Sequence, residues 1–125
     1  MTIVCCGIMV NEALEAARIL EGRGISAEIV KINLIARKDY PMTMASLQKT
    51  GRLVAAEEVC AAGCLGSSLL SQAAERRIPF QGARLLNLGK GIVAHGDRKL
   101  LMRDAGIDAE SIASAAAELC GKTKL

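Results

Sequence analysis

Short apolar runs alternate along this chain with longer segments in which apolar residues recur every three or four positions. A short run of β-branched or small apolar residues is typical of a buried strand, and the longer repeat is typical of a helix with one buried face. The runs predict four strands, at residues 2–6, 25–34, 53–57 and 83–88. The repeats predict five helices, at residues 11–21, 42–49, 67–76, 97–105 and 109–119.

Polar residues at the expected helix starts support these boundaries. Asn11, Ser67 and Asp108 are side chains that commonly cap a helix N-terminus. Residues 39–41, Asp-Tyr-Pro, are typical of a turn. Strands that alternate with helices predict an α/β three-layer sandwich with a mainly parallel (mixed) sheet of four to five strands. Because the sequence shows no internal repeat or linker, residues 1–125 are expected to form one domain.

The composition restricts both the core and the class of partner. Hydrophobic residues make up 51% of the chain and aromatic residues 2%, so the core must consist mainly of Ala, Leu, Ile and Val. Scarce aromatics argue against a fold that stacks nucleic-acid bases. The interspersed charges, with a net charge of +3, predict neither a nucleic-acid nor a membrane surface. No apolar run is long enough for a membrane helix, and five cysteines without a disulfide spacing favour the cytoplasm.

The turn after the third predicted strand is the best candidate for a functional site. Two adjacent carboxylates, Glu57 and Glu58, end the strand, and a small-residue turn with Gly63 and Gly66 leads to Ser67. Open α/β folds place ligands and interfaces at such corners. Adjacent strand side chains point to opposite faces, which favours a structural hydrogen bond or a basic partner over a joint acid–base pair. The glycine-rich helix start leaves a weak anion site as the alternative.

Other catalytic patterns are missing from the sequence. The turn after the first predicted strand has one glycine, Gly7, where a dinucleotide-binding fold has three. Cys60 and Cys64 are four positions apart, which is not the spacing of zinc or redox pairs. The single histidine, His95, cannot complete a metal site. We therefore assign no catalytic, cofactor-binding or metal-binding residue to this chain.

Several segments form a recognisable pattern in their order along nearly the whole chain. They are Gly7, 11–17, 24–30, Glu57-Glu58 with Gly63, Gly66 and Ser67, Leu88-Gly89, His95-Gly96 and 105–112. The pattern resembles the C-terminal domain of transketolase-type enzymes, and its last stretch is most similar to the 1-deoxy-D-xylulose-5-phosphate synthase branch. Cys64 stands where that family usually has a second glycine, and Arg-Lys-Asp at 37–39 replaces a usual Pro-Leu-Asp turn.

The resemblance implies an enzyme that uses thiamine diphosphate and Mg to move a two-carbon unit from pyruvate or a ketose to an aldose phosphate. In that family the active site lies between a diphosphate-binding and a pyrimidine-binding domain, both missing from this sequence. The chain is then expected to bind no cofactor and to be inactive alone, and to support domain packing and a homodimer.

Under this interpretation the turn after the third strand is an interface. The expected interface residues are Glu57, Glu58, Gly63, Gly66 and Ser67, with His95 and Gly96 on a nearby loop. A free-standing module that binds a small anion or metabolite at the same turn is the alternative, and a subunit without enzyme activity is a third possibility.

Overall fold

The computed structural model describes residues 1–36 and 40–122, which form four strands and five helices. The strands are β1 (Thr2–Cys6), β2 (Glu28–Ile32), β3 (Arg52–Ala56) and β4 (Gly82–Leu86). The helices are α1 (Met9–Glu21), α2 (Pro41–Thr50), α3 (Leu65–Glu75), α4 (Arg98–Asp104) and α5 (Ala109–Leu119). The expected turn at Asp39 and the Arg-Lys-Asp segment at 37–39 lie outside the described residues.

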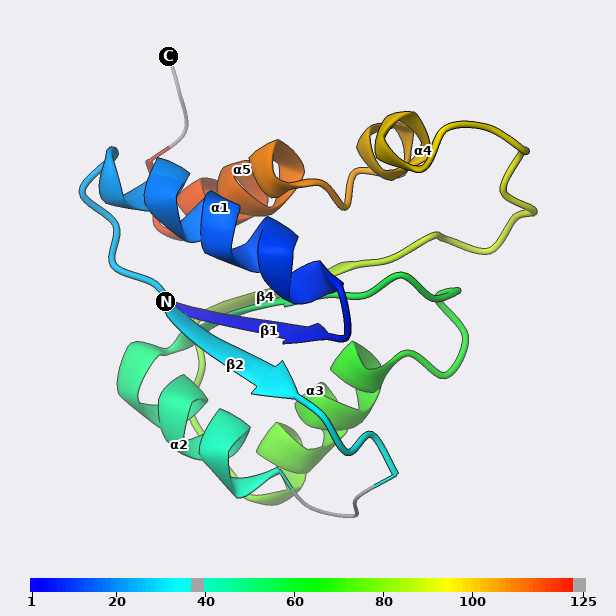
Figure 1. Cartoon of the computed structure of the whole chain (residues 1–125). Helices are drawn as coiled ribbons and strands as arrows, with labels where there is room; N and C mark the ends of the chain where they lie inside the picture. Colours follow the sequence, from blue (N-terminus) through cyan, green and yellow to red (C-terminus); the bar gives the residue numbers. More distant parts are fainter. Residues whose placement is uncertain (37–39, 123–125) are drawn as a thin grey trace.

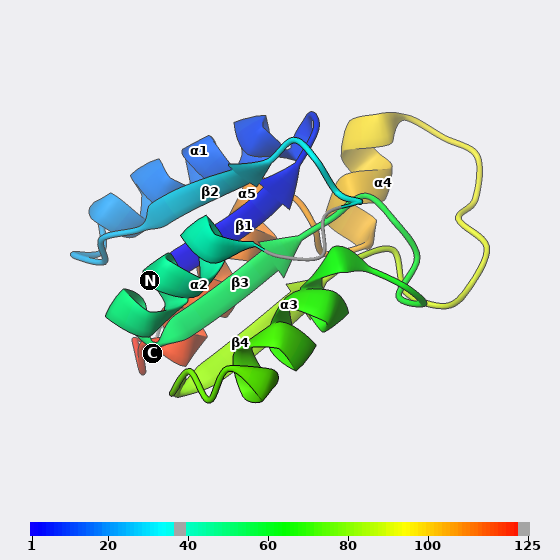
Figure 2. The same ribbon diagram turned by 90° about the horizontal axis from the view of Figure 1, so that it is seen from below.

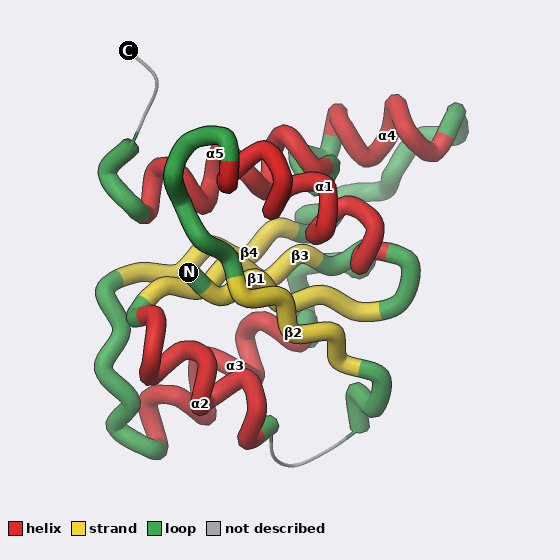
Figure 3. The backbone as a smooth tube through the Cα atoms, turned by 60° about the vertical axis from the view of Figure 1, so that its left-hand side comes forward, coloured by secondary structure: helices red, strands yellow, loops and turns green. Residues whose placement is uncertain are grey.

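The described strands form one sheet in the order β2-β1-β3-β4, and all neighbouring pairs are parallel. Helices α1 and α5 cover one face and α2 and α3 the other, while α4 lies beyond the carboxyl ends of the strands (Figures 1 and 2). A view from the side shows the same three layers (Figure 3). The predicted α/β sandwich is confirmed. The described part of the sheet is parallel throughout, rather than mixed.

The alternation of side chains along β3 divides the core in two. Val54 and Ala56 pack with the buried faces of α1 and α5, whereas Leu53 and Ala55 pack with α2 and α3. All four side chains are buried, because β3 is a central strand with helices on both of its faces. This explains why its sequence is a continuous apolar run.

Two helices begin earlier than the sequence predicts. Helix α1 begins at Met9 and α3 at Leu65, so Asn11 and Ser67 lie inside the first turns and are not the capping residues. The residues at the N-cap positions, Ile8 and Cys64, do not cap the helix amides with their side chains. Helix α1 instead follows a tight backbone turn after β1. By contrast, the predicted cap at Asp108 is confirmed, since its carboxylate accepts a hydrogen bond from the Ser111 amide.

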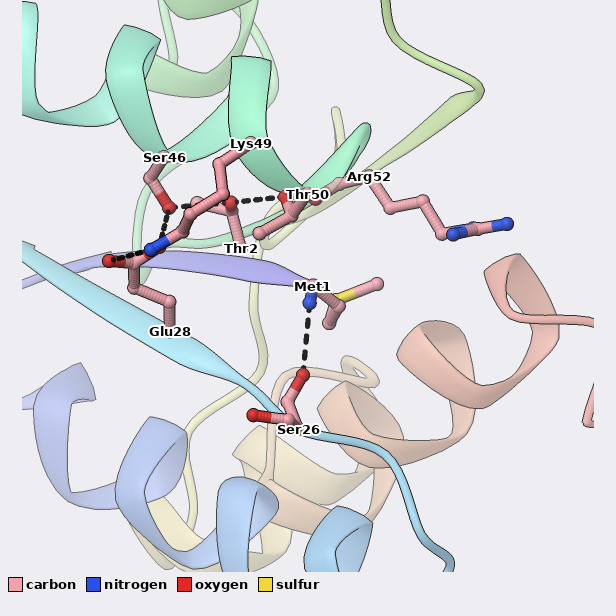
Figure 4. A network of polar contacts seen from close by, with 8 residues as sticks. All are labelled: Met1, Thr2, Ser26, Glu28, Ser46, Lys49, Thr50 and Arg52. Atoms are coloured by element: carbon pink, nitrogen blue, oxygen red, sulfur yellow. Dashed lines mark hydrogen bonds and ion pairs between the residues drawn. The ribbon is translucent and has the colours of Figure 1, made fainter.

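Polar side chains form a hydrogen-bonded network at the amino ends of the strands (Figure 4). The Thr2 hydroxyl lies 2.7 Å from the hydroxyls of both Ser46 and Thr50. Ser46 donates to the Glu28 carboxylate at 2.8 Å, and Lys49 forms an ion pair with the same carboxylate at 2.8 Å. The hydrogen bonds from Lys49 and Ser46 hold the pKa of Glu28 below its usual value. The polar groups at this end therefore satisfy one another.

Within residues 1–36 and 40–122, no helix is both long and apolar enough to cross a membrane.

Candidate functional site

The turn after β3, from Glu57 to Ser67, which we call the corner, lies beside the loop after β1. These two neighbouring connections lead to helices on opposite faces of the sheet. The loop after β1 leads to α1 on one face, and the turn after the neighbouring β3 leads to α3 on the other face (Figure 1). In open α/β sheets, diverging loops of this kind leave a crevice at the carboxyl ends of the strands. The predicted placement of the corner at this end of the sheet is thus confirmed.

Glu57 caps helix α3 from the end of the neighbouring strand. Its side chain is buried, with 6% exposed, and its two carboxylate oxygens accept hydrogen bonds from the amides of Leu65 (2.8 Å) and Gly66 (2.7 Å). A negative charge at this position also interacts favourably with the helix dipole. The carboxylate explains why α3 begins before Ser67. It also occupies two of the amides at the helix start that an external anion would use.

Glu58 has a different partner from Glu57 and binds the start of α4. Its carboxylate accepts hydrogen bonds from Nε (3.0 Å) and Nη2 (2.8 Å) of Arg98, a bidentate ion pair. The pair joins segments 40 positions apart in the sequence. The two adjacent glutamates therefore do not form an acid–base pair, as the alternation of strand side chains predicts.

The two glycines of the corner have different structural roles. Gly63 has a φ of +75°, in the left-handed region that glycine adopts without strain. Gly66 lies in the first turn of α3, where a Cβ would come within 2.6 Å of Leu85 Cδ2 and 3.1 Å of Ala55 Cβ. Helix α3 can approach β3 and β4 closely because this position carries no side chain.

Cys64 and Ser67 are accommodated without strain. Cys64 is the buried N-cap residue of α3, with φ of −62° and ψ of 148°, a conformation open to any residue. Its Sγ lies 3.2 Å from the Oγ of Ser67, which is exposed. The close approach of backbone and sheet is therefore at Gly66, not at the position where the family usually has its second glycine.

The loop between β4 and α4 starts alongside the corner. The Leu88 amide donates to the carbonyl of Val59 at 2.9 Å, and the Ala61 amide donates to the carbonyl of Gly89 at 2.8 Å. His95 and Gly96 lie farther along this loop and are exposed. For the described residues, no hydrogen bond or ion pair joins His95 to either glutamate. The structure thus brings the start of the loop, rather than His95, to the corner.

Two polar contacts of this region were not foreseen from the sequence. Arg98 binds Glu58, and Glu12 of α1 accepts a hydrogen bond from the Ala109 amide at the start of α5, at 2.9 Å. The Glu12 contact joins residues 97 positions apart. Neither contact can be predicted from the neighbouring sequence, because each joins segments that are far apart along the chain.

The chemistry available at the corner is limited. Burial raises the pKa of the Cys6 thiol, and the Glu57 carboxylate raises it further, so this thiol is a poor nucleophile at neutral pH. Among the residues that the structure describes, no three His, Cys, Asp or Glu side chains converge as metal ligands. A nearby hollow beside α3 is lined by Ser68, Ser71 and Glu75, and its described lining contains no basic residue.

Comparison with known proteins decides the family. The family model described as the C-terminal domain of transketolase matches residues 1–112. The chain belongs to this family. The resemblance stated from the sequence is therefore confirmed.

The relatives are large enzymes of which this chain matches one part. A 1-deoxy-D-xylulose-5-phosphate synthase from Heliobacterium modesticaldum is 34% identical over 119 residues, which cover 95% of this chain and 18% of that protein. A 6-deoxy-6-sulfo-D-fructose transketolase subunit from Clostridium sp. (strain MSTE9) is 43% identical over 68 residues, covering 54% of this chain and 21% of that protein.

A solved structure shows the same fold in a larger chain. The chain described as "Split gene transketolase, inactive beta4 tetramer" has a TM-score of 0.79 and 30% sequence identity. The match covers 98% of this chain and 40% of that one. This transketolase C-terminal domain thus corresponds to less than half of each of these relatives.

Proposed function

We propose that this chain is a non-catalytic domain of a thiamine-diphosphate-dependent enzyme of the 1-deoxy-D-xylulose-5-phosphate synthase type. Its role is to hold the other domains and a second subunit in place. The observation that carries this proposal is the use of both corner glutamates in internal contacts. Glu57 caps α3 and Glu58 binds Arg98, so neither is free to take part in a reaction.

The residues of this domain do not fit the cofactor of the whole enzyme. Mg prefers carboxylate oxygens, and no three His, Cys, Asp or Glu side chains converge as metal ligands among the described residues. A diphosphate requires free amides or basic side chains, but the Leu65 and Gly66 amides are bonded to Glu57. Under this proposal, thiamine diphosphate and Mg bind to the diphosphate-binding and pyrimidine-binding domains, which belong to the same chain or to a separate one.

The assembly and the compartment follow from the same proposal. A homodimer is the expected assembly, with this domain contributing to its interface. The five cysteines are all unpaired, which supports a reducing cytoplasm. No nucleic acid or membrane is a partner in this proposal.

The proposal is tested with the purified chain alone. Calorimetric titration with thiamine diphosphate and Mg is expected to give no saturable heat, and pyruvate with an aldose phosphate is expected to give no product. Turnover by the isolated chain would overturn the non-catalytic role. Titration with inorganic phosphate addresses the alternative anion-binding module, for which the occupied amides of α3 predict no binding; saturable phosphate binding would favour that module.

A further inference from the structure

A long connection leaves the carboxyl end of β4, runs outward past the sheet and returns as α4 (Figures 1 and 2). All residues from 90 to 100 are exposed, and we call them the strap. In the part of the chain that the structure describes, residues 90–96 form no hydrogen bond or ion pair with another element. Few buried apolar contacts and few hydrogen bonds characterise a segment that opens locally while the rest of a protein stays folded.

Both ends of the strap are fixed. Before it, the Leu88 amide donates to the Val59 carbonyl at 2.9 Å, and the Ala61 amide donates to the Gly89 carbonyl at 2.8 Å. After it, Met102 is buried in the core, with 3% exposed. Gly89 has a φ of +76°, and an added Cβ would meet nothing within 4 Å, so the backbone has room to rotate there. The middle of the strap therefore needs a contact of its own to hold it in place.

The Arg98–Glu58 ion pair supplies that contact. Arg98 belongs to the strap and Glu58 to the corner, and the guanidinium donates to both carboxylate oxygens, at 3.0 and 2.8 Å. The Glu12 carboxylate attracts Arg98 more weakly and is itself bonded to the Ala109 amide. Both side chains of the pair are exposed, 43% for Arg98 and 36% for Glu58, so dissolved ions reach them.

We infer that the strap is a conformational device latched by the Arg98–Glu58 ion pair, and that loss of this pair lets residues 90–100 swing between Gly89 and Met102 while the sheet stays folded. An ion pair between exposed groups contributes little to stability, so the latched and open forms differ by a small free energy. The open form releases the Glu58 carboxylate, so the latch decides whether that charge is available at the corner. The inference goes beyond the proposed function and does not depend on it.

The test follows the exchange of single backbone amides with solvent by NMR. The reporter is the Leu101 amide, which donates to the Asp97 carbonyl at 3.0 Å across the first turn of α4. The reference is the amide of Val54, a fully buried residue of the central strand β3. Salt at about 1 M shortens the range of electrostatic interactions to about 3 Å. We expect it to speed exchange at Leu101 about two- to fivefold and to leave Val54 unchanged.

Three variants tie this effect to the ion pair. Glu58→Gln and Arg98→Gln are each expected to give the fast Leu101 exchange already at low salt, and to remove its dependence on salt. The double variant is expected to exchange no faster than either single variant, because the two side chains act as one unit. The matched control is Lys49→Gln, which removes the ion pair with Glu28 at the other end of the sheet and is expected to leave Leu101 exchange unchanged.

Three results would overturn the latch. If neither salt nor the two single variants change exchange at Leu101, the packing of Met102 alone holds the strap. If exchange at Val54 rises in proportion to that at Leu101, the ion pair stabilises the whole domain and opens nothing locally. If the effects of Glu58→Gln and Arg98→Gln add in the double variant, the two side chains act separately.

Discussion

Gly66 has a defined structural role in the corner after β3. A methyl group at this position would come within 3.1 Å of Ala55 Cβ, which cannot move away by rotation. The better helix propensity of alanine offers about 1 kcal/mol, whereas overpacking a tight contact costs about 1–3 kcal/mol. We therefore expect Gly66→Ala to lower the free energy of unfolding, measured by urea denaturation.

The control for Gly66 is a glycine in open space. Gly91 lies in the exposed loop after β4, where an added Cβ meets nothing within 4 Å. Gly91→Ala is expected to leave stability unchanged or slightly higher, because it restricts only the unfolded chain. Equal stability of Gly66→Ala and the unmodified protein would contradict the close approach of α3 to the sheet.

The two corner glutamates differ in what they contribute to stability. Glu57→Gln replaces one accepting oxygen with a donor and removes the charge at the start of α3, so we expect a loss of about 1–2 kcal/mol. Glu58→Gln affects an exposed ion pair with Arg98, which solvent screens, so a smaller loss than for Glu57→Gln is expected. Urea denaturation of both variants measures the difference; a larger loss for Glu58→Gln would refute the capping role of Glu57.

Cys5 is expected to make the free energy of unfolding depend on pH in the alkaline range. Burial, together with the adjacent Cys6, raises the pKa of the Cys5 thiol from 9.0 to about 11. The unfolded chain loses this proton at a lower pH than the folded chain does. The stabilising contribution is therefore complete below pH 9 and is lost as the pH rises towards about 11.

Urea denaturation across this pH range checks the contribution of Cys5. We expect the free energy of unfolding to fall more steeply in the unmodified protein than in Cys5→Ala, because lysine and tyrosine titration is common to both. Identical slopes for the two proteins would show that Cys5 ionises alike in the folded and unfolded chains.

At the scale of elements, the α1–α5 pair depends on small side chains. Ala13 and Ala16 of α1 share a buried core with Ala113 of α5. Ala113→Leu is expected to lower the free energy of unfolding by about 1–3 kcal/mol, since a larger side chain must separate the helices. Ser114→Leu, on the exposed side of α5, is the control and is expected to change it by less than about 0.5 kcal/mol. Equal effects would argue against tight helix pairing.

The order of the elements could be predicted from the sequence because each depends on its own periodicity. The apolar run of β3 and the Asp108 cap are local signals, and both were interpreted correctly. The predicted start of α3 was wrong because the side chain that caps this helix comes from Glu57, directly after β3 and eight positions before the helix begins. The predicted strand at 25–34 is shorter in the structure, where β2 is Glu28–Ile32.

The corner itself could be predicted only in part. Its position follows from the apolar run of β3, and the separate partners of Glu57 and Glu58 agree with the expectation from strand alternation, although β3 itself ends at Ala56. The partner of Glu58 could not be foreseen, because Arg98 reaches the corner through the long loop after β4. Residue contacts that depend on such loops carry no signal in a single sequence.

At the scale of the whole molecule, the domain has two unlike ends. Polar side chains satisfy one another at the amino ends of the strands, where Phe80 before β4 is also exposed, whereas an exposed apolar side chain follows each of the four strands at the carboxyl ends. The fold family supports the proposal that this domain completes a larger enzyme by binding to the rest of it. The proposed function gives the corner after β3 a packing role and no part in the reaction.

A chimera tests this account most directly. In it, the 125 residues of this chain replace the C-terminal domain of the Heliobacterium modesticaldum synthase. Activity with thiamine diphosphate and the mass of the assembly are compared with those of the intact enzyme and of the enzyme truncated before that domain. We expect the chimera to assemble like the intact enzyme and to keep its activity within about tenfold. A chimera as dissociated and inactive as the truncated enzyme would contradict the account.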